Sequence, residues 1–137
     1  MKFHSPGAQS DMPPEKPLNI LIVDDEEIVR DTLTALIGLL GHAPECAADG
    51  LQGREILMKK KFDAAFVDIR MPGLDGISLL KWSKQACLDL PVIIMTGHGS
   101  EDAQREAIES GAFTFFNKPF SIMEIKETII KIEKGLQ

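Results

Sequence analysis

Short apolar runs that alternate with longer amphipathic stretches are the feature that most limits how this chain can fold. Three of the runs are almost continuously hydrophobic, which is typical of parallel strands that are covered on both faces of a sheet. We therefore expect five strands, of which the second is the weakest. They are LNILIV (18–23), APECAA (43–48), DAAFVD (63–68), PVIIM (91–95) and AFTFF (112–116).

The stretches between these runs carry the signals of helices. Apolar residues recur there at helical spacing, and we expect such stripes to pack in the core. Two of them are Val29, Leu33, Leu36 and Leu40, and Ile122, Ile125, Ile129 and Ile132. Asp49 and Ser121, each followed three residues later by Gln or Glu, predict helix starts, whereas Gly41 and Gly111 predict helix ends.

Alternating strands and helices predict an α/β fold with one parallel sheet between two layers of helices. At 137 residues a single (βα)5 domain of the flavodoxin-like type is expected, with strand order 2-1-3-4-5. Residues 1–16 hold three of the eight prolines and few apolar residues, so we expect a flexible N-terminal tail before a folded domain over 17–137.

The charge balance limits the partners of this domain. The net charge is −6, and direct nucleic-acid binding normally requires clustered basic residues. The only basic run, residues 59–61, is better explained as an exposed helix end. Nothing near Met1 resembles a signal peptide, and disorder and membrane classes do not fit the composition. We expect a cytoplasmic protein, in which Cys46 and Cys87 are small core or half-buried residues without metal-site spacing.

Polar side chains follow four of the predicted strands at the points where they end. Asp24 and Asp25 follow the first strand, Asp68 ends the third, Thr96 follows the fourth and Lys118 follows the fifth. The carboxyl ends of parallel strands meet at one edge, and strands one and three are neighbours in the expected order. Three carboxylates should therefore share a small volume beside a threonine hydroxyl and an ammonium group.

Such a group of carboxylates requires a positive charge, because like charges in close proximity oppose one another's ionisation. Oxygen ligands without His or Cys favour Mg²⁺, or Mn²⁺, with a phosphate group completing the coordination. Lys118 can pair with Asp68 and later with phosphate oxygens, and the Thr96 hydroxyl can donate to a phosphoryl oxygen. Phosphoryl transfer depends mainly on such positioning, and an Asp carboxylate can accept the group.

These residues resemble the receiver domain of bacterial two-component response regulators, across residues 18–134. That family has an acidic pair after strand one, an acceptor Asp after strand three, Thr or Ser after strand four and Lys-Pro after strand five. The matching residues here are Asp24 with Asp25, Asp68, Thr96, and Lys118 with Pro119. Loop residues also match, namely Met71, Pro72, Gly73, Asp75, Gly76 and Gly97.

The resemblance implies roles for these residues. Asp68 would be the phosphoacceptor, and Asp25, Asp68 and the main-chain carbonyl of Arg70 would contact the metal, with Asp24 acting mainly through water. Phe115 would be the switch aromatic that responds to Thr96, in a chain that contains no Tyr. A further implication is a cis bond between residues 118 and 119.

The resemblance also implies partners. A sensor histidine kinase or a phosphotransfer protein would donate the group, and an output domain or a second copy would bind on the side of strands four and five. Arg70 and His98 stand where the family tunes hydrolysis, although simple surface placement is equally open.

Three other functions would require different features in the sequence. A haloacid-dehalogenase-like phosphatase would need a second acid where Arg70 stands, and a longer chain. A nucleotide-binding module would need a glycine-rich phosphate loop, which the sequence does not contain. A receiver-like scaffold that is never phosphorylated would be expected to have lost one of the key residues.

Overall fold

The computed structural model describes residues 16–97 and 99–135, and in this range it has one five-stranded parallel sheet. The strand order is β2-β1-β3-β4-β5, as predicted. The strands are β1 (Asn19–Val23), β2 (Ala43–Ala47), β3 (Ala64–Asp68), β4 (Val92–Thr96) and β5 (Thr114–Asn117). All but one residue of the expected N-terminal tail lie outside the described residues, as does His98.

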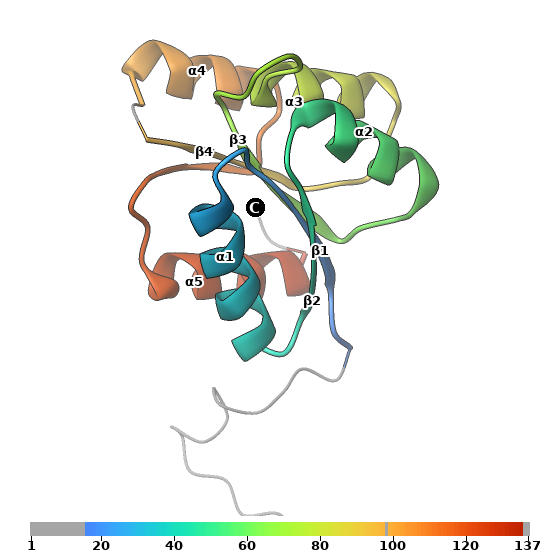
Figure 1. Cartoon of the computed structure of the whole chain (residues 1–137), viewed down its shortest axis with the longest axis vertical. Helices are drawn as coiled ribbons and strands as arrows, with labels where there is room; N and C mark the ends of the chain where they lie inside the picture. Colours follow the sequence, from blue (N-terminus) through green and yellow to red (C-terminus); the bar gives the residue numbers. More distant parts are fainter. Residues whose placement is uncertain (1–15, 98, 136–137) are drawn as a thin grey trace, which may run out of the picture.

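The helices form the two outer layers of the predicted sandwich. They are α1 (Glu27–Leu39), α2 (Gly50–Lys59), α3 (Gly76–Gln85), α4 (Glu101–Glu109) and α5 (Ile122–Glu133). Helices α1 and α5 lie on one face of the sheet, and α2, α3 and α4 lie on the other (Figure 1). No helix in the part of the chain that the structure describes is long and apolar enough to cross a membrane.

Side chains of the central strands alternate between two apolar cores, because successive residues of a strand point to opposite faces of the sheet. On the α1 and α5 side, Ile22 and Phe66 pack with Leu33 and Ile125. On the other side, Val23 and Val67 pack with residues of α3 and α4. Every residue of β3 and β4 is buried, which explains why their sequences are almost continuously hydrophobic.

The predicted helix boundaries agree with the capping hydrogen bonds and the glycine conformations in the structure. The Asp49 carboxylate accepts from the N–H of Gln52 at 2.8 Å and begins α2. The Ser121 hydroxyl accepts from the third N–H of α5 at 3.1 Å. Gly41 and Gly111 follow α1 and α4 with φ values of 89° and 98°, a left-handed conformation that favours glycine. All four predictions of helix ends are confirmed.

Three expectations are corrected. Ile122 is 40% exposed and does not belong to the core, because burial along α5 starts only at Ile125. Cys87 is exposed, whereas Cys46 is half-buried as expected. The fifth strand begins two residues later than predicted, because the N–H of Ala112 bonds to the carbonyl of Ala107 and closes the end of α4.

Candidate functional site

The three aspartates predicted to converge do lie together at the carboxyl edge of the sheet. Asp24 follows β1 and Asp68 ends β3, and these two strands are hydrogen-bonded neighbours. One carboxylate oxygen from each of Asp24, Asp25 and Asp68 lies within 4.8 Å of the others. Asp24 and Asp68 are buried, while Asp25 is exposed and leaves the cluster open to solvent. A set of hard oxygen ligands with one open side fits a divalent cation such as Mg²⁺.

Lys118 pairs with two aspartates of the carboxylate cluster and with Glu26. Its Nζ is 3.0 Å from Asp68 Oδ1, 2.8 Å from Asp24 Oδ2 and 3.3 Å from Glu26 Oε1. The pair with Asp68 was predicted, whereas the contacts with Asp24 and Glu26 were not. The peptide bond from Lys118 to Pro119 is cis, as the family resemblance implied. The ammonium group therefore bridges the ends of β1, β3 and β5.

The surroundings of Asp68 change its acidity. Burial raises its pKa from 3.8 to about 6, the hydrogen bond from Lys118 opposes the shift, and the charges of Asp24 and Asp25 add to it. Burial by itself would lower the pKa of Lys118, but its hydrogen bonds to the two buried aspartates outweigh that effect and raise it. Lys118 therefore stays charged at neutral pH, while Asp68 loses its proton less readily than an ordinary aspartate.

Thr96 closes the site on the β4 side. It is the last residue of β4, is buried, and lines the same cavity as Asp68 and Lys118. The N–H of Lys118 donates to the Thr96 carbonyl at 2.7 Å, which fixes the end of β5 to the end of β4. The predicted threonine and lysine are thus brought together with Asp68.

Phe115 lies on β5, which β4 separates from the strand that carries Asp68, and it is half-buried against the core on the α3 and α4 side. A Cβ atom at Gly99 would lie 3.2 Å from its Cε1 and 2.9 Å from Cγ2 of Thr96. The loop between β4 and α4 therefore passes close to both residues. A movement of Thr96 and a movement of the Phe115 ring would both change the space for this loop.

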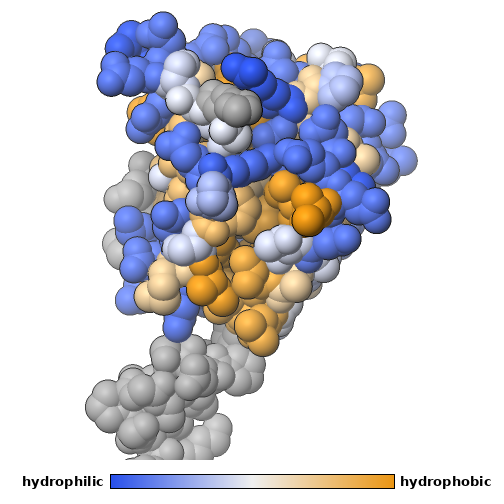
Figure 2. All heavy atoms as spheres, turned by 60° about the vertical axis from the view of Figure 1, so that its left-hand side comes forward, coloured by the Kyte–Doolittle hydropathy of each residue, from blue (hydrophilic) through white to orange (hydrophobic). Residues whose placement is uncertain are grey.

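The cavity that contains the site has a volume of about 630 Å³ and two kinds of wall. Its charged wall includes Asp25, Asp68 and Lys118. Its other wall includes Ile28, Val29 and Phe120. Ile28 is 72% exposed, and on α5 Met123 is 56% exposed. Figure 2 brings this side of the molecule forward and shows apolar side chains gathered beneath a polar rim. A partner that reaches the carboxylates would meet apolar surface beside them.

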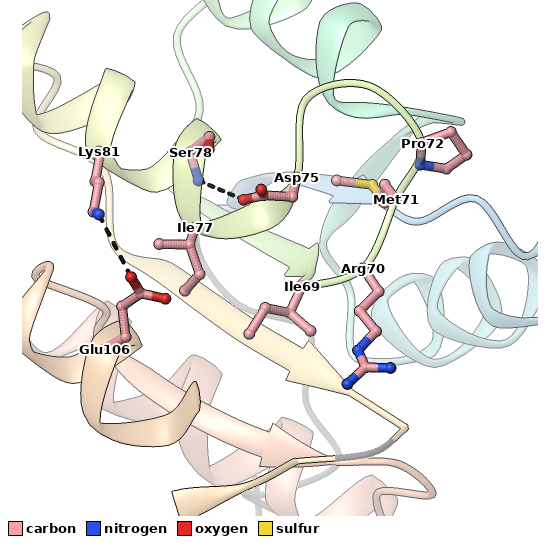
Figure 3. Close-up of a pocket in the computed structure, with 9 residues that line it drawn as sticks. All are labelled: Ile69, Arg70, Met71, Pro72, Asp75, Ile77, Ser78, Lys81 and Glu106. Atoms are coloured by element: carbon pink, nitrogen blue, oxygen red, sulfur yellow. Dashed lines mark hydrogen bonds and ion pairs between the residues drawn. The ribbon is translucent and has the colours of Figure 1, made fainter. Parts of the chain in front are cut away.

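Arg70 lies between this cavity and a second one of about 620 Å³. Its side chain is exposed and points away from Asp75 and Ser78 (Figure 3). The Asp75 carboxylate accepts from the N–H of Ser78 at 2.8 Å, so this side chain begins α3 and is not available to the carboxylate cluster. The role of the Arg70 carbonyl as a metal ligand stays a prediction.

Two residues at the start of α1, its N-cap Glu26 and Arg30, hold Asp24 and were not predicted from the sequence. Arg30 Nη1 donates to the main-chain carbonyl of Asp24 at 2.8 Å, and the N–H of Glu26 donates to Asp24 Oδ1 at 2.9 Å. Asp24 is fully buried, and its carboxylate is satisfied by the N–H of Glu26 and the Lys118 ammonium group, while Arg30 binds its main-chain carbonyl. Arg30 is not one of the residues that match the family motif. Only its place in the first turn of α1, six residues after Asp24, could have suggested the contact.

Comparison with known proteins gives consistent matches. The chain matches the family model described as response regulator receiver domain over residues 20–130. It is 41% identical over 112 residues to Sporulation initiation phosphotransferase F of Bacillus subtilis (strain 168), covering 82% of this chain and 90% of that protein. The receiver domain of the Francisella response regulator 1452 superposes with a TM-score of 0.80 at 28% identity, covering 86% of this chain and 98% of the other.

Other relatives are longer than this chain. It is 41% identical over 121 residues to the DNA-binding transcriptional regulator NtrC of Proteus hauseri, covering 86% of this chain and 24% of that protein. It is 30% identical over 109 residues to the response regulator MprA of Mycobacterium sp. (strain KMS), covering 80% of this chain and 47% of that protein. The similarity to these two relatives therefore concerns only part of each.

Proposed function

Because this chain belongs to the response regulator receiver family, which acts in two-component signalling, we propose that Asp68 accepts a phosphoryl group in a metal-dependent reaction. The observation that carries the proposal is the cluster in which carboxylate oxygens of Asp24, Asp25 and Asp68 lie within 4.8 Å of one another. Two of them, Asp24 and Asp68, pair with the Lys118 ammonium group. We take residues 17–137 as the receiver unit. The donor is the phosphohistidine of a sensor histidine kinase or of a phosphotransfer protein.

Each residue of the cluster has a distinct part in the proposed reaction. An ionised Asp68 oxygen attacks phosphorus, and the leaving group departs with the electron pair of the broken bond. Lys118 and the Thr96 hydroxyl bind the phosphoryl oxygens and stabilise the charge that is distributed over them. These groups are already in place, so the chain contributes chiefly by orientation. The same site would allow slow loss of the group to water, and we propose no other enzymatic activity.

Mg²⁺, or Mn²⁺ in its place, is the proposed cofactor. Asp25, Asp68 and the Arg70 carbonyl would hold it, with Asp24 contributing through water. When bound, it supplies positive charge that neutralises the carboxylates and the phosphoryl oxygens. The exposed position of Asp25 supports this assignment, because a hydrated ion needs an open side.

Magnesium is expected to raise the melting temperature by several degrees at millimolar concentration, because it binds only the folded cluster and relieves carboxylate repulsion. Asp25→Asn should remove most of this gain, since the side chain is exposed and contributes to the cluster mainly through its charge. The matched control is Asp31→Asn, an exposed residue of α1 in the described range. Thermal melts with and without MgCl₂ measure the effect, and equal gains in both variants would refute the assignment of Asp25.

Phosphorylation of Asp68 is expected when the protein is incubated with MgCl₂ and phosphoramidate or acetyl phosphate. Intact-mass spectrometry should show one added phosphoryl group, which should be absent in Asp68→Asn and strongly reduced when EDTA removes the metal. Persistence of the adduct in Asp68→Asn would exclude Asp68 as the acceptor.

We propose that Thr96 and Phe115 transmit the effect of phosphorylation to the surface of the domain. As the Thr96 hydroxyl turns toward the new phosphoryl oxygens, it vacates space beside Phe115. Since this ring has no polar tip to keep it in water, deeper burial is favourable. The surface formed by α4, β5 and α5 would then change, and an output domain or a second copy of the chain would bind there. The domain itself, with its net charge of −6, is not proposed to bind nucleic acid.

Amide NMR with beryllofluoride, a phosphoryl mimic, tests this readout. Chemical-shift changes should extend from Asp68 through Thr96 to residues 100–125, and Thr96→Ala should confine them to the loops around the acceptor. Changes that stay near Asp24 and Asp68 in the parent protein would contradict the switch.

A further inference from the structure

Glu26 occupies the N-cap position of α1, where an acidic side chain would ordinarily accept from the first free N–H groups of the helix. Its carboxylate makes no such capping hydrogen bond. Instead, Oε1 lies 3.3 Å from Nζ of Lys118, which follows β5 and is separated from Glu26 by 92 positions in the sequence. The Glu26 side chain therefore contacts the functional lysine and does not cap its own helix.

The Lys118 ammonium has three N–H donors and three carboxylate neighbours. The side chains of Asp24 and Asp68 are 0% and 6% exposed, and their contacts are short. The Glu26 side chain is 58% exposed, and its contact is the longest of the three. An anion that enters from solvent therefore meets Glu26 as the one partner of Lys118 that can be displaced without uncovering a buried charge.

We propose that Glu26 is a positioning residue that competes with phosphoryl oxygens for the Lys118 ammonium and thereby slows phosphorylation of Asp68. This inference rests on the function proposed above. In the reaction with acetyl phosphate, a bond forms between an Asp68 oxygen and phosphorus while the bond from phosphorus to the acetate oxygen breaks, and acetate leaves with the electron pair. Lys118 must turn an N–H toward the transferred oxygens during this step, and Glu26 holds the N–H that is most accessible to them.

The experiment compares Glu26→Gln, Glu26→Asp and the control Glu27→Gln. Glu27 is the adjacent exposed acid, it begins α1, and its removal changes the net charge by the same amount. Rates of adduct formation are measured by intact mass with MgCl₂ and either acetyl phosphate or phosphoramidate. Glu26→Gln should react about two to five times faster than the parent with both donors, the range expected for loss of one exposed ion pair.

Glu26→Asp separates the contact from the charge. Its shorter side chain keeps the negative charge but is too short to hold the same contact, so we expect it to react as fast as Glu26→Gln. The advantage of both variants should shrink as salt is added, because the exposed pair in the parent is screened. The metal-free melting temperature should change by no more than a few degrees in all three variants, because one exposed ion pair contributes at most about 1 kcal/mol.

Three results would overturn the inference. They are a Glu26→Gln rate equal to or below that of the parent, a Glu26→Asp rate equal to that of the parent, and an equal acceleration in Glu27→Gln. The last two would show a general charge effect and not competition for Lys118. If the parent protein forms no adduct on Asp68, the proposed function fails, whereas an adduct formed at equal rates in parent and Glu26→Gln refutes only the role of Glu26.

Discussion

Replacing Lys118 by methionine is expected to lower the free energy of unfolding at pH 7 by about 3 kcal/mol, because it leaves two buried carboxylates without their counterion. Lys118 contacts both Asp24 and Asp68, and its own side chain is only 13% exposed. Methionine keeps a similar length and apolar stem, so the loss reflects the charge. Urea denaturation in the absence of metal measures the effect.

Lys81→Met is the matched control for this substitution. Lys81 pairs with Glu106 at 3.7 Å across α3 and α4, with both side chains more than half exposed (Figure 3). Exposed pairs of this kind contribute less than about 1 kcal/mol, so the control should be nearly neutral. Magnesium should restore part of the stability of Lys118→Met, because a cation can replace the ammonium charge. Equal losses in the two variants would mean that the site lysine does not neutralise the aspartates.

Asp68→Asn is expected to act in the opposite direction and to make the metal-free protein more stable. The pKa of Asp68 is raised from 3.8 to about 6, mainly by burial, so the folded protein holds this proton more tightly than the unfolded chain does. The stability that the neutral form contributes is fully present below about pH 4 and is lost as the pH rises through about 6. At pH 7 the ionised group therefore reduces the stability of the parent, and the neutral asparagine removes that cost.

The expected gain at pH 7 is about 2 kcal/mol, within the limit that a shift of about two pKa units sets. The two proteins should approach equal stability at pH 3.5, because Asp68 of the parent is then mostly protonated and the asparagine of the variant carries no charge. Denaturation curves at the two pH values, recorded in EDTA, measure the difference. A gain that is the same at both pH values would show that the asparagine stabilises the fold by packing and not by removing a charge.

Much of the fold followed from local patterns. The apolar runs predicted β1, β3 and β4 well, because strands buried on both faces must be hydrophobic at nearly every position. The predicted buried stripe of α5 wrongly included Ile122, because the spacing of apolar residues along a helix cannot show where the sheet beneath it ends. The end of α4 determined where β5 begins, and a hydrogen bond at Ala112 of this kind is invisible in the sequence.

The sequence predicted those parts of the site in which strand order alone brings residues close together. Strand order places Asp24, Asp68 and Lys118 at one edge, so their convergence needed no knowledge of side-chain conformation. The contacts of Arg30 and Glu26 depend on which way long side chains turn from the first turn of α1, and several directions are open to such residues. For this reason the sequence placed Asp68 beside Lys118 but did not reveal which groups hold Asp24 or that Glu26 contacts Lys118.

Chemical localisation of the phosphoryl group tests the central claim most directly. Borohydride reduces an aspartyl phosphate to homoserine, so protein treated with phosphoramidate and MgCl₂, then reduced and digested, can be analysed residue by residue by tandem mass spectrometry. We expect homoserine at position 68 and unmodified aspartate at positions 24 and 25. Homoserine at either of those positions, or a phosphoryl adduct that gives no homoserine at position 68, would contradict the assignment of Asp68 as the phosphoacceptor.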